Sequence, residues 1–201
     1  MPNLDVILKE IDYGLNILFE SNNTDGEDNQ LTDSDKTKSQ RVMRVNHMGE
    51  VCAQALYRGQ ALTTKDDAMI EIINNMCEEE KDHLVSLNQR LSELSGRPSK
   101  LNSLWYLSSF LLGAYVGTLE KDKSYGFIYE TENQVEDHLD EYSKKLPDKD
   151  LESKTILEEI KMDEIKHKNT AKNHGSTELS KFSKSLMSLT SKVMKKISYY
   201  I

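Results

Sequence analysis

The sequence predicts an all-α fold, and three of its features lead to that prediction. Gly and Pro, the residues that interrupt helices, number only 9 and 3 among 201 residues. Charged residues make up 30% of the chain, and the alternating β-branched runs typical of strands are few. A single glutamate on one helical stretch is followed, in each half of the chain, by Glu-x-x-His on the next. The length suits one domain with its own hydrophobic core.

The chain ahead of the expected bundle divides into two parts. Residues 1–20 place apolar side chains near helical spacing and predict a short amphipathic helix. Residues 21–38 are polar and acidic with almost nothing to bury, so we expect a flexible linker there. We see no basic segment followed by an apolar core at the start of the sequence, and therefore expect no signal peptide.

The first two bundle helices are expected at residues 39–62 and 63–95. Threonine hydroxyls at the start of the second helix can cap it, and two aspartates in its first turn suit the positive end of its dipole. At its other end, Gly96 is expected to adopt the left-handed cap conformation, while Pro98 blocks continuation.

The expected domain covers residues 39–175, and its second half contains an unusual apolar stretch. Residues 101–119 carry no charge, and the helical pattern is then interrupted until it resumes over 127–144. The last bundle helix is expected over 151–173, with Gly175 at its end.

A ligand pattern for metal ions repeats in the two halves. It consists of a single Glu followed 30 or 32 residues later by Glu-x-x-His, about the span of one helical hairpin. Residues three apart share a helix face, so each motif directs a carboxylate and an imidazole to one point. This inventory is that of di-iron and di-manganese bundles. The candidate ligands are Glu50, Glu80, His83, Glu132, Glu164 and His167.

The oxygen-rich set suits iron or manganese better than structural zinc. Spacing leaves the third ligand open, because Glu132 and Glu136 share a helix face while Glu130 faces elsewhere. Glu79, one turn before His83, is a candidate for orienting a ligand. The alternative for the whole set is a group of solvated helix faces with ordinary ion pairs.

Other polar residues near the pattern have two interpretations each. Tyr57 lies two turns beyond Glu50 and can donate a hydrogen bond into the metal site, or it is a half-buried core residue. His47 is within reach of a metal, although a hydrogen-bonding role is favoured. For His138 and His174 we expect supporting or surface positions rather than ligation.

Composition excludes several classes of function. A net charge of −8 argues against nucleic acid as a partner. No G-x-G-x-x-G or Walker pattern is present, so a flavin, NAD or nucleotide domain is not expected. Cys52 and Cys77 lack C-x-x-C spacing, which fits a reducing compartment and excludes an attached rubredoxin-type iron site.

Two segments indicate contact with a membrane. Residues 101–119 include several polar side chains and the pair Trp105-Tyr106, so we expect a segment lying in the interface with its aromatic rings at headgroup level. A buried bundle helix is the alternative. The tail, residues 176–201, is predicted to be a basic amphipathic helix that binds an anionic bilayer, with a groove on a partner protein as its alternative. Its lysines are Lys181, Lys184, Lys192, Lys195 and Lys196.

Longer strings of sequence surround these positions. They are Arg44-Val-Asn-His-Met-Gly-Glu50 with Tyr57-Arg-Gly-Gln60, Leu104-Trp-Tyr106 with Asp122-Lys-Ser-Tyr-Gly-Phe127, Thr131-Glu132 with Val135-Glu-Asp-His-Leu139, and Met162-Asp-Glu-Ile-Lys-His167. Together these strings, from residue 40 onward, resemble the demethoxyubiquinone hydroxylase family. The chain departs from the family pattern at Met48, Cys52, Leu107-Ser108 and Glu120-Lys121, none of which is a candidate ligand.

The resemblance implies a ferritin-like four-helix di-iron bundle with an extra N-terminal helix, a membrane-facing apolar segment and a C-terminal amphipathic helix. It assigns two iron ions per chain to the six candidate ligands and selects Glu132 as the third. The implied activity is an O₂-dependent monooxygenase that hydroxylates the ring of a polyprenylated demethoxyubiquinol in ubiquinone biosynthesis. The electron donor stays open between NADH and a quinol.

A polyprenyl substrate stays in the bilayer, so the resemblance also implies a peripheral protein on the cytoplasmic face of the cell membrane. Three other classes share part of the pattern. A ferritin-like iron store would lack the apolar segment and the basic tail, and a rubrerythrin-like peroxidase would bring a cysteine-rich iron site. A membrane-binding helical scaffold would need none of the six ligands.

Overall fold

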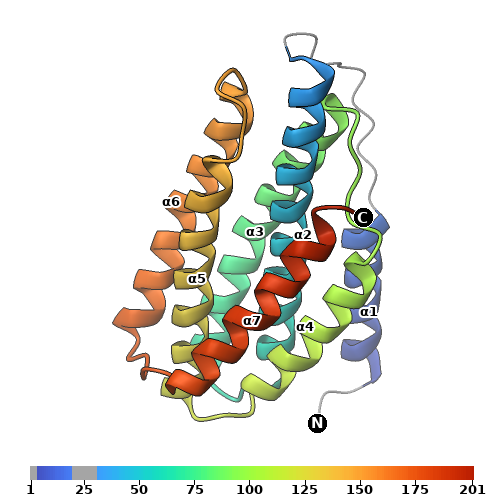
Figure 1. Cartoon of the computed structure of the whole chain (residues 1–201). Coiled ribbons are helices and arrows are strands. Elements are labelled where there is room, and N and C mark those ends of the chain that lie inside the picture. The colour runs from blue at the N-terminus through green and yellow to red at the C-terminus, as the bar shows by residue number, and fades with distance from the viewer. Residues whose placement is uncertain (1–3, 20–30) are drawn as a thin grey trace.

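A computed structural model describes residues 4–19 and 31–201, and every regular element in these ranges is an α-helix (Figure 1). The expected all-α fold is therefore confirmed. The helices are α1 (Leu4–Phe19), α2 (Asp33–Thr63), α3 (Asp67–Glu93), α4 (Asn102–Val116), α5 (Lys121–Ser143), α6 (Leu151–Asn173) and α7 (Lys181–Ser198).

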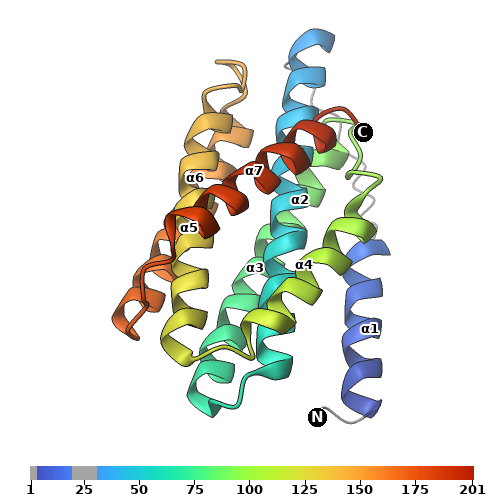
Figure 2. The same cartoon turned by 60° about the horizontal axis from the view of Figure 1, so that its bottom comes forward.

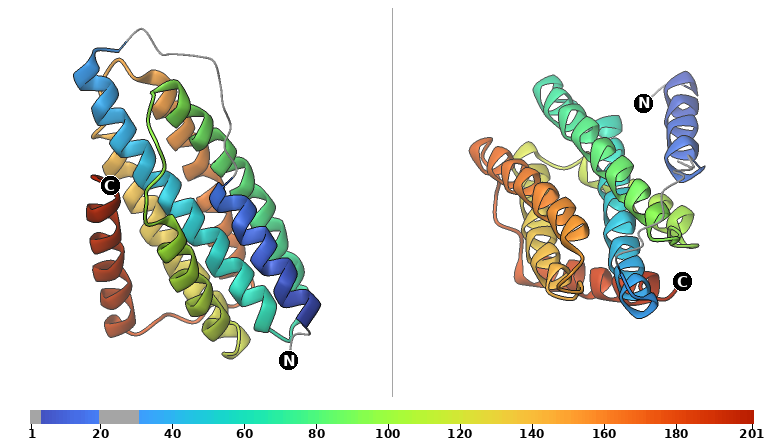
Figure 3. Two further views of the ribbon diagram at one scale, coloured as in Figure 1. Left: turned by 90° about the vertical axis from the view of Figure 1, so that its right-hand side faces the viewer. Right: turned by 90° about the horizontal axis from the view of Figure 1, so that it is seen from above.

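Four of the helices, α2, α3, α5 and α6, run along a common long axis and form the bundle (Figure 1). Helix α2 packs against α3 and α4, and α5 packs against α6. The other three helices lie outside this bundle. Helix α7 crosses α5 and α2 obliquely (Figure 2), whereas α1 and α7 lie on different sides of the bundle when it is seen from above (Figure 3).

Helix α2 begins earlier than expected. The predicted linker covered residues 21–38, of which 21–30 lie outside the described residues, but residues 33–38 are helical. The reason is a local cap: the Asp35 amide donates to the Thr32 hydroxyl at 3.2 Å, and Asp33 and Asp35 suit the positive end of the helix dipole. The acidic composition of this segment therefore starts a helix instead of preventing one.

Three other expectations about helix ends were wrong. Thr63 belongs to the end of α2, and α3 starts only at Asp67, where the Asp66 side chain and not a threonine hydroxyl forms the cap. Helix α5 starts at Lys121 and runs without interruption through the segment where the pattern appeared broken. At the end of α3, the left-handed residue is Ser95, with φ 56°, and not Gly96. The Gly96 amide still donates to the Leu91 carbonyl at 2.7 Å, so the helix ends in a bonded cap. At the end of α6, Gly175 has φ 88°.

Glycines allow α4 to lie unusually close to α2. A Cβ added at Gly59 would collide with the Phe110 carbonyl oxygen, and one added at Gly113 would collide with the Leu56 carbonyl oxygen. The two backbones are therefore in direct contact at these glycines, on one face of α4.

The opposite face of α4 is apolar and exposed. Its exposed residues are Leu104, Leu107, Leu111, Leu112 and Tyr115. The expected position of both aromatic rings at headgroup level was wrong, because Tyr106 is buried and stacks on Phe110, with ring centroids 6.4 Å apart. Trp105 is half-buried, and its indole N–H donates to the Ser198 hydroxyl of α7 at 3.1 Å.

Helix α7 has the same division into an inner and an outer face. Its outer apolar residues are Phe182, Leu186, Leu189 and Val193. None of the helices in the described ranges is long and apolar enough to cross a bilayer.

Helix α1 is attached to α2 by polar contacts. The Arg58 guanidinium donates to both oxygens of Glu10, at 2.7 and 2.6 Å, and lies 4.1 Å from the ring centroid of Tyr13. The Tyr13 hydroxyl donates to Gln54 at 2.9 Å. These contacts hold an amphipathic helix against the outside of the bundle, beside α2 and α4.

Candidate metal centre

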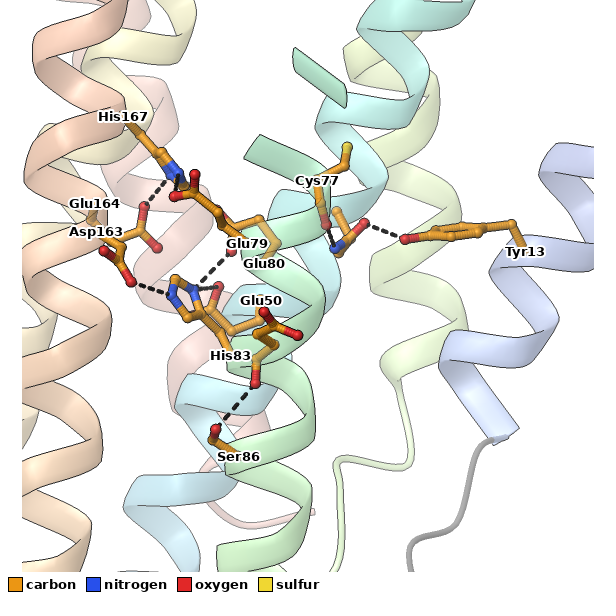
Figure 4. Close-up of polar contacts among 12 residues, drawn as sticks. Tyr13, Glu50, Cys77, Glu79, Glu80, His83, Ser86, Asp163, Glu164 and His167 are labelled. Atoms are coloured by element: carbon orange, nitrogen blue, oxygen red, sulfur yellow. Dashed lines mark hydrogen bonds and ion pairs between the residues drawn. The ribbon is translucent and has the colours of Figure 1, made fainter. Parts of the chain in front are cut away.

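The six predicted ligands come from all four bundle helices and meet in the interior. Helix α2 carries the first glutamate and α5 the third, while α3 and α6 each carry one Glu-x-x-His motif. All six side chains are buried. Figure 4 shows four of them, Glu50, Glu80, His83 and Glu164, converging from three helices, with His167 on the far side of Glu80.

The ligand atoms form two groups. The first group contains Glu50, Glu80, His83 and Glu164, and the second contains Glu132, Glu164 and His167. Within each group, one ligand atom from every residue lies within 4.8 Å of the others. Because Glu164 belongs to both groups, the two lie side by side.

Glu80 also lies between the two groups. One of its oxygens is 3.4 Å from His83 Nδ1, and the other is 3.3 Å from His167 Nδ1. His167 Nδ1 lies 3.3 Å from Glu164 as well. The two motif glutamates are therefore central, with one histidine on each side of them.

The outer nitrogen of each histidine faces a carboxylate of the opposite helix. His83 Nε2 on α3 lies 3.2 Å from Asp163 on α6, and His167 Nε2 on α6 lies 3.0 Å from Glu79 on α3 (Figure 4). Asp163 and Glu79 each directly precede the glutamate of a motif. This arrangement directs Nδ1 of both rings toward the central carboxylates and fixes the orientation of the rings.

Crowding of buried acids and imidazoles changes their protonation. Burial, together with the charge of Glu80, raises the pKa of Glu50 to about 8. The pKa of Glu132 is also raised well above its usual value, by burial and by the charge of Glu164. Burial alone would lower the pKa of His83, but contacts with Glu50 and Glu80 outweigh it and raise that pKa to about 12. Such shifts are typical of functional sites.

The donor set fits metal ions better than it fits a purely structural cluster. Both oxygens of Glu132 are buried and accept no hydrogen bond within the described part of the chain. Unsatisfied buried carboxylates are costly, and a cation supplies the missing partner. Four carboxylates with two imidazoles match the preferences of iron and manganese.

The structure distinguishes Glu132 from the acids that compete with it. Glu132 is buried among the other candidate ligands, whereas Glu136 pairs with Lys168, and Glu130 accepts a hydrogen bond from Gln134 at 2.8 Å. Both alternatives are thus engaged in ion pairs or hydrogen bonds away from the centre.

The other histidines and Tyr57 lie around the centre rather than in its ligand groups. His47 is buried, with Nδ1 3.2 Å from Asn102 of α4. His138 packs on Tyr142, and His174 is exposed. Tyr57 is buried with its ring edge-on to His167, the centroids 6.5 Å apart, and its hydroxyl has no hydrogen-bond partner among the described residues.

Comparison with known proteins assigns a family. The family model described as "Ubiquinone biosynthesis protein COQ7" matches residues 37–198. The chain belongs to the COQ7 family. This confirms the family expected from its sequence, and the match covers the bundle, α4 and α7.

Individual relatives are similar over most of the chain or all of it. A protein of Nitrosomonas europaea is 39% identical over the full length of both chains. A protein of Burkholderia cenocepacia is 40% identical, covering 98% of this chain and 99% of its own. A Coxiella burnetii protein is 45% identical over 85% of this chain and 80% of its own. All three are named 3-demethoxyubiquinol 3-hydroxylase.

Sequence reasoning missed Asp163 as a partner of His83, and it missed Arg90. The sequence does indicate Asp163, because this acid directly precedes the second Glu-x-x-His motif just as Glu79 directly precedes the first. Arg90 gave no signal, since its role depends on a long-range contact with Asp150, 60 residues later, at 2.9 Å.

Proposed function

We propose that this protein is an O₂-dependent di-iron monooxygenase that hydroxylates the ring of a polyprenylated demethoxyubiquinol, in ubiquinone biosynthesis. The observation that carries the proposal is the pair of ligand groups sharing Glu164 in the centre of a four-helix bundle. The names of the relatives supply the substrate class.

The residues divide between two ions. Glu50 and His83 would hold one ion, and Glu132 and His167 would hold the other; the carboxylates of Glu80 and Glu164 lie between these two pairs. When bound, a pair of iron ions supplies the redox chemistry that activates O₂. The reaction places one oxygen atom on a ring carbon and releases the other as water, so a donor must supply a pair of electrons. NADH and a quinol are the two candidate donors.

The surrounding protein orients the centre and excludes water. Glu79 and Asp163 hold the two histidines in position, and burial of all six ligands keeps bulk water away from the oxidising centre. We assign Tyr57 a positioning role beside His167, where its unpartnered hydroxyl can donate a hydrogen bond into the site.

The test is a single-turnover reaction. The protein is loaded anaerobically with Fe(II) and mixed with a short-chain demethoxyubiquinol and O₂; we expect a hydroxylated product that depends on O₂, with about two iron ions per chain. Glu164→Ala should abolish the product and most iron binding while the protein stays helical. Glu136→Ala is the matched control and should keep both. Iron bound at this ratio without any hydroxylated product would refute the hydroxylase assignment.

The substrate class explains the exposed apolar faces of α4 and α7. A polyprenyl chain stays in the bilayer, so we propose that these two helices rest on the cytoplasmic surface of the cell membrane and that the protein is peripheral. Leu107→Glu with Leu111→Glu should reduce flotation with phospholipid vesicles strongly. Leu151→Glu, at an exposed leucine on α6, should not. Equal flotation of both variants would contradict this orientation.

A further inference from the structure

A pocket of about 510 Å³ lies between the end of α5 and the C-terminal half of α7. Its walls carry four lysines, three tyrosines and one acid. The lining residues are Glu141, Tyr142, Lys145, Lys192, Lys195, Lys196, Tyr199 and Tyr200. The volume is within the range of small-molecule sites.

The pocket carries an excess of positive charge, with four lysines against one acid. Its one acid, Glu141, is already paired with Lys145 at 2.7 Å. Within the described ranges, no carboxylate lies within ion-pair distance of Lys192, Lys195 or Lys196. Clustered cations repel one another, and an anion in the pocket would relieve that repulsion.

The lysines of the pocket affect the pKa values of two groups, the half-buried Lys195 and the buried His138. Burial lowers the pKa of the half-buried Lys195; the charge of Glu141 opposes this shift, and the charges of Lys145 and Lys192 add to it. His138 is buried behind Tyr142, with ring centroids 4.3 Å apart, and its Nδ1 has no hydrogen-bond partner among the described residues. Burial, Lys195 and Lys145 hold the pKa of His138 well below its usual range.

Tyrosine rings form the rest of the pocket wall, and cationic side chains lie over these rings. The Lys145 ammonium lies 3.7 Å from the centroid of Tyr142. The Arg41 guanidinium, from α2, lies 5.6 Å from the centroid of Tyr199 and 5.4 Å from that of Tyr200. The ligand therefore needs an anionic group for the lysines and an organic part that packs against tyrosines.

We propose that this pocket binds the phosphate group of an organic phosphate. A phosphate offers several acceptor oxygens to separate ammonium groups, and lysine is a common phosphate ligand. The pocket volume exceeds that of a bare phosphate ion, which leaves room for an attached organic group. Two sources share this chemistry: the headgroup of an anionic phospholipid and a free organic phosphate.

The lipid source is consistent with the position of the pocket. Val193, on the exposed apolar face of α7, lies between Lys192 and Lys195 in the sequence. A bilayer in contact with that face would bring headgroups close to the lysines. The protein also carries its own reporter, because its single tryptophan, Trp105, is hydrogen-bonded to α7 at Ser198.

The experiment uses the full chain and two probes. In the first arm, sn-glycerol 3-phosphate is titrated and binding is followed by ³¹P line broadening and Trp105 fluorescence. In the second arm, phosphatidylcholine vesicles carry either phosphatidylglycerol or a fatty acid at equal negative charge. Lys192→Gln with Lys195→Gln removes the site, and Lys65→Gln with Lys172→Gln, at exposed lysines outside the tail, is a control with the same change in net charge.

We expect the pocket variant, but not the control, to weaken binding by roughly tenfold or more in at least one arm. If the pocket variant loses binding to phosphatidylglycerol vesicles, with or without loss of binding to sn-glycerol 3-phosphate, the ligand is a lipid headgroup. If it loses binding only to sn-glycerol 3-phosphate, the ligand is a free organic phosphate. Lys192→Arg with Lys195→Arg should keep binding, and thermal melting checks folding. Identical behaviour of pocket variant and control, or an equal loss on fatty-acid vesicles, overturns the proposal.

Discussion

His167 of α6 and Glu79 of α3 face each other across the bundle, with Nε2 of the imidazole 3.0 Å from the carboxylate. Asp163 and His83 repeat this contact in the opposite direction at 3.2 Å. Helices α3 and α6 therefore each supply a candidate ligand histidine and an acid that contacts the histidine of the other helix. The two contacts tie α3 to α6 at the centre of the bundle.

Removing one orienting acid should weaken metal binding without removing a ligand. Glu79→Gln loses the charge beside His167, and loss of such an outer partner lowers metal affinity by about 10–100-fold. Titration with Fe(II) or Co(II), followed by optical absorption, measures the change. Glu78→Gln, at an exposed neighbouring position, is the control and should leave the affinity unchanged. Equal affinity of Glu79→Gln and the unmodified protein would mean that ring orientation does not depend on this contact.

Without metal, the protein should become less stable as the pH rises from 6 to 9. Burial and the charge of Glu80 raise the pKa of Glu50 to about 8. The contribution of Glu50 to the stability of the folded state is therefore lost as the pH rises from the pKa of an unfolded glutamate toward 8. Burial alone would lower the pKa values of His83 and His167, but their carboxylate partners raise both to about 12. The two histidines therefore stabilise the folded state fully at a pH below the pKa of an unfolded histidine, and this stabilisation decreases as the pH rises further. Both effects have the same sign.

Thermal melting of the metal-free protein across this range checks the prediction. Glu50→Gln should flatten the dependence between pH 6 and 8. Metal binding requires deprotonated carboxylates and neutral imidazoles, so added Fe(II) should raise the melting temperature more at pH 8 than at pH 5. A metal-free melting temperature that rises with pH would contradict the shifts.

The convergence of the six candidate ligands could largely be predicted, because two helical motifs at three-residue spacing determine which faces turn inward. Periodicity could not separate Glu132 from Glu136, since both share one face of α5. The separation depends on where α6 places Lys168, which pairs with Glu136. The start of α2 differs from the prediction for another reason: the cap residue Thr32 is visible in the sequence, but an acidic and polar composition is also typical of linkers.

The attachment of the outer helices depends on contacts that no local pattern carries. Helix α1 is fixed by Glu10 and Arg58, which are 48 residues apart, and α4 by the glycines that face α2. Amphipathic periodicity predicts such a helix but does not determine the surface against which it packs.

The glycine contact between α2 and α4 leads to a prediction about stability. Gly113→Ala inserts a methyl group against the Leu56 carbonyl oxygen, a backbone atom that cannot move away alone. Overpacking of this kind costs about 1–3 kcal/mol. Gly49→Ala is the matched control, because a Cβ there meets no atom within 4 Å, and the helical preference of Ala should stabilise α2 by roughly 0.5–1 kcal/mol. Urea unfolding measures both, and changes of the same sign would contradict the close contact.

Arg90 should be among the most sensitive residues outside the metal centre. Its buried guanidinium donates to Asp150 at 2.9 Å, to Ser153 at 3.0 Å and to Glu152 at 2.8 Å, joining α3 to the first turn of α6. Arg90→Met leaves the Asp150 carboxylate buried without its counterion, and breaking a buried pair from one side costs about 3–5 kcal/mol. Urea unfolding should show a loss of this size.

A double substitution tests the cause of that loss. Adding Asp150→Asn to Arg90→Met removes the stranded charge, so the pair of substitutions should cost clearly less than the sum of the two single ones. Arg97→Met, at an exposed arginine just beyond the end of α3, should change stability by less than about 0.5 kcal/mol. If the two single losses simply add, Arg90 contributes through packing alone, and the ion pair with Asp150 does not determine how α6 starts.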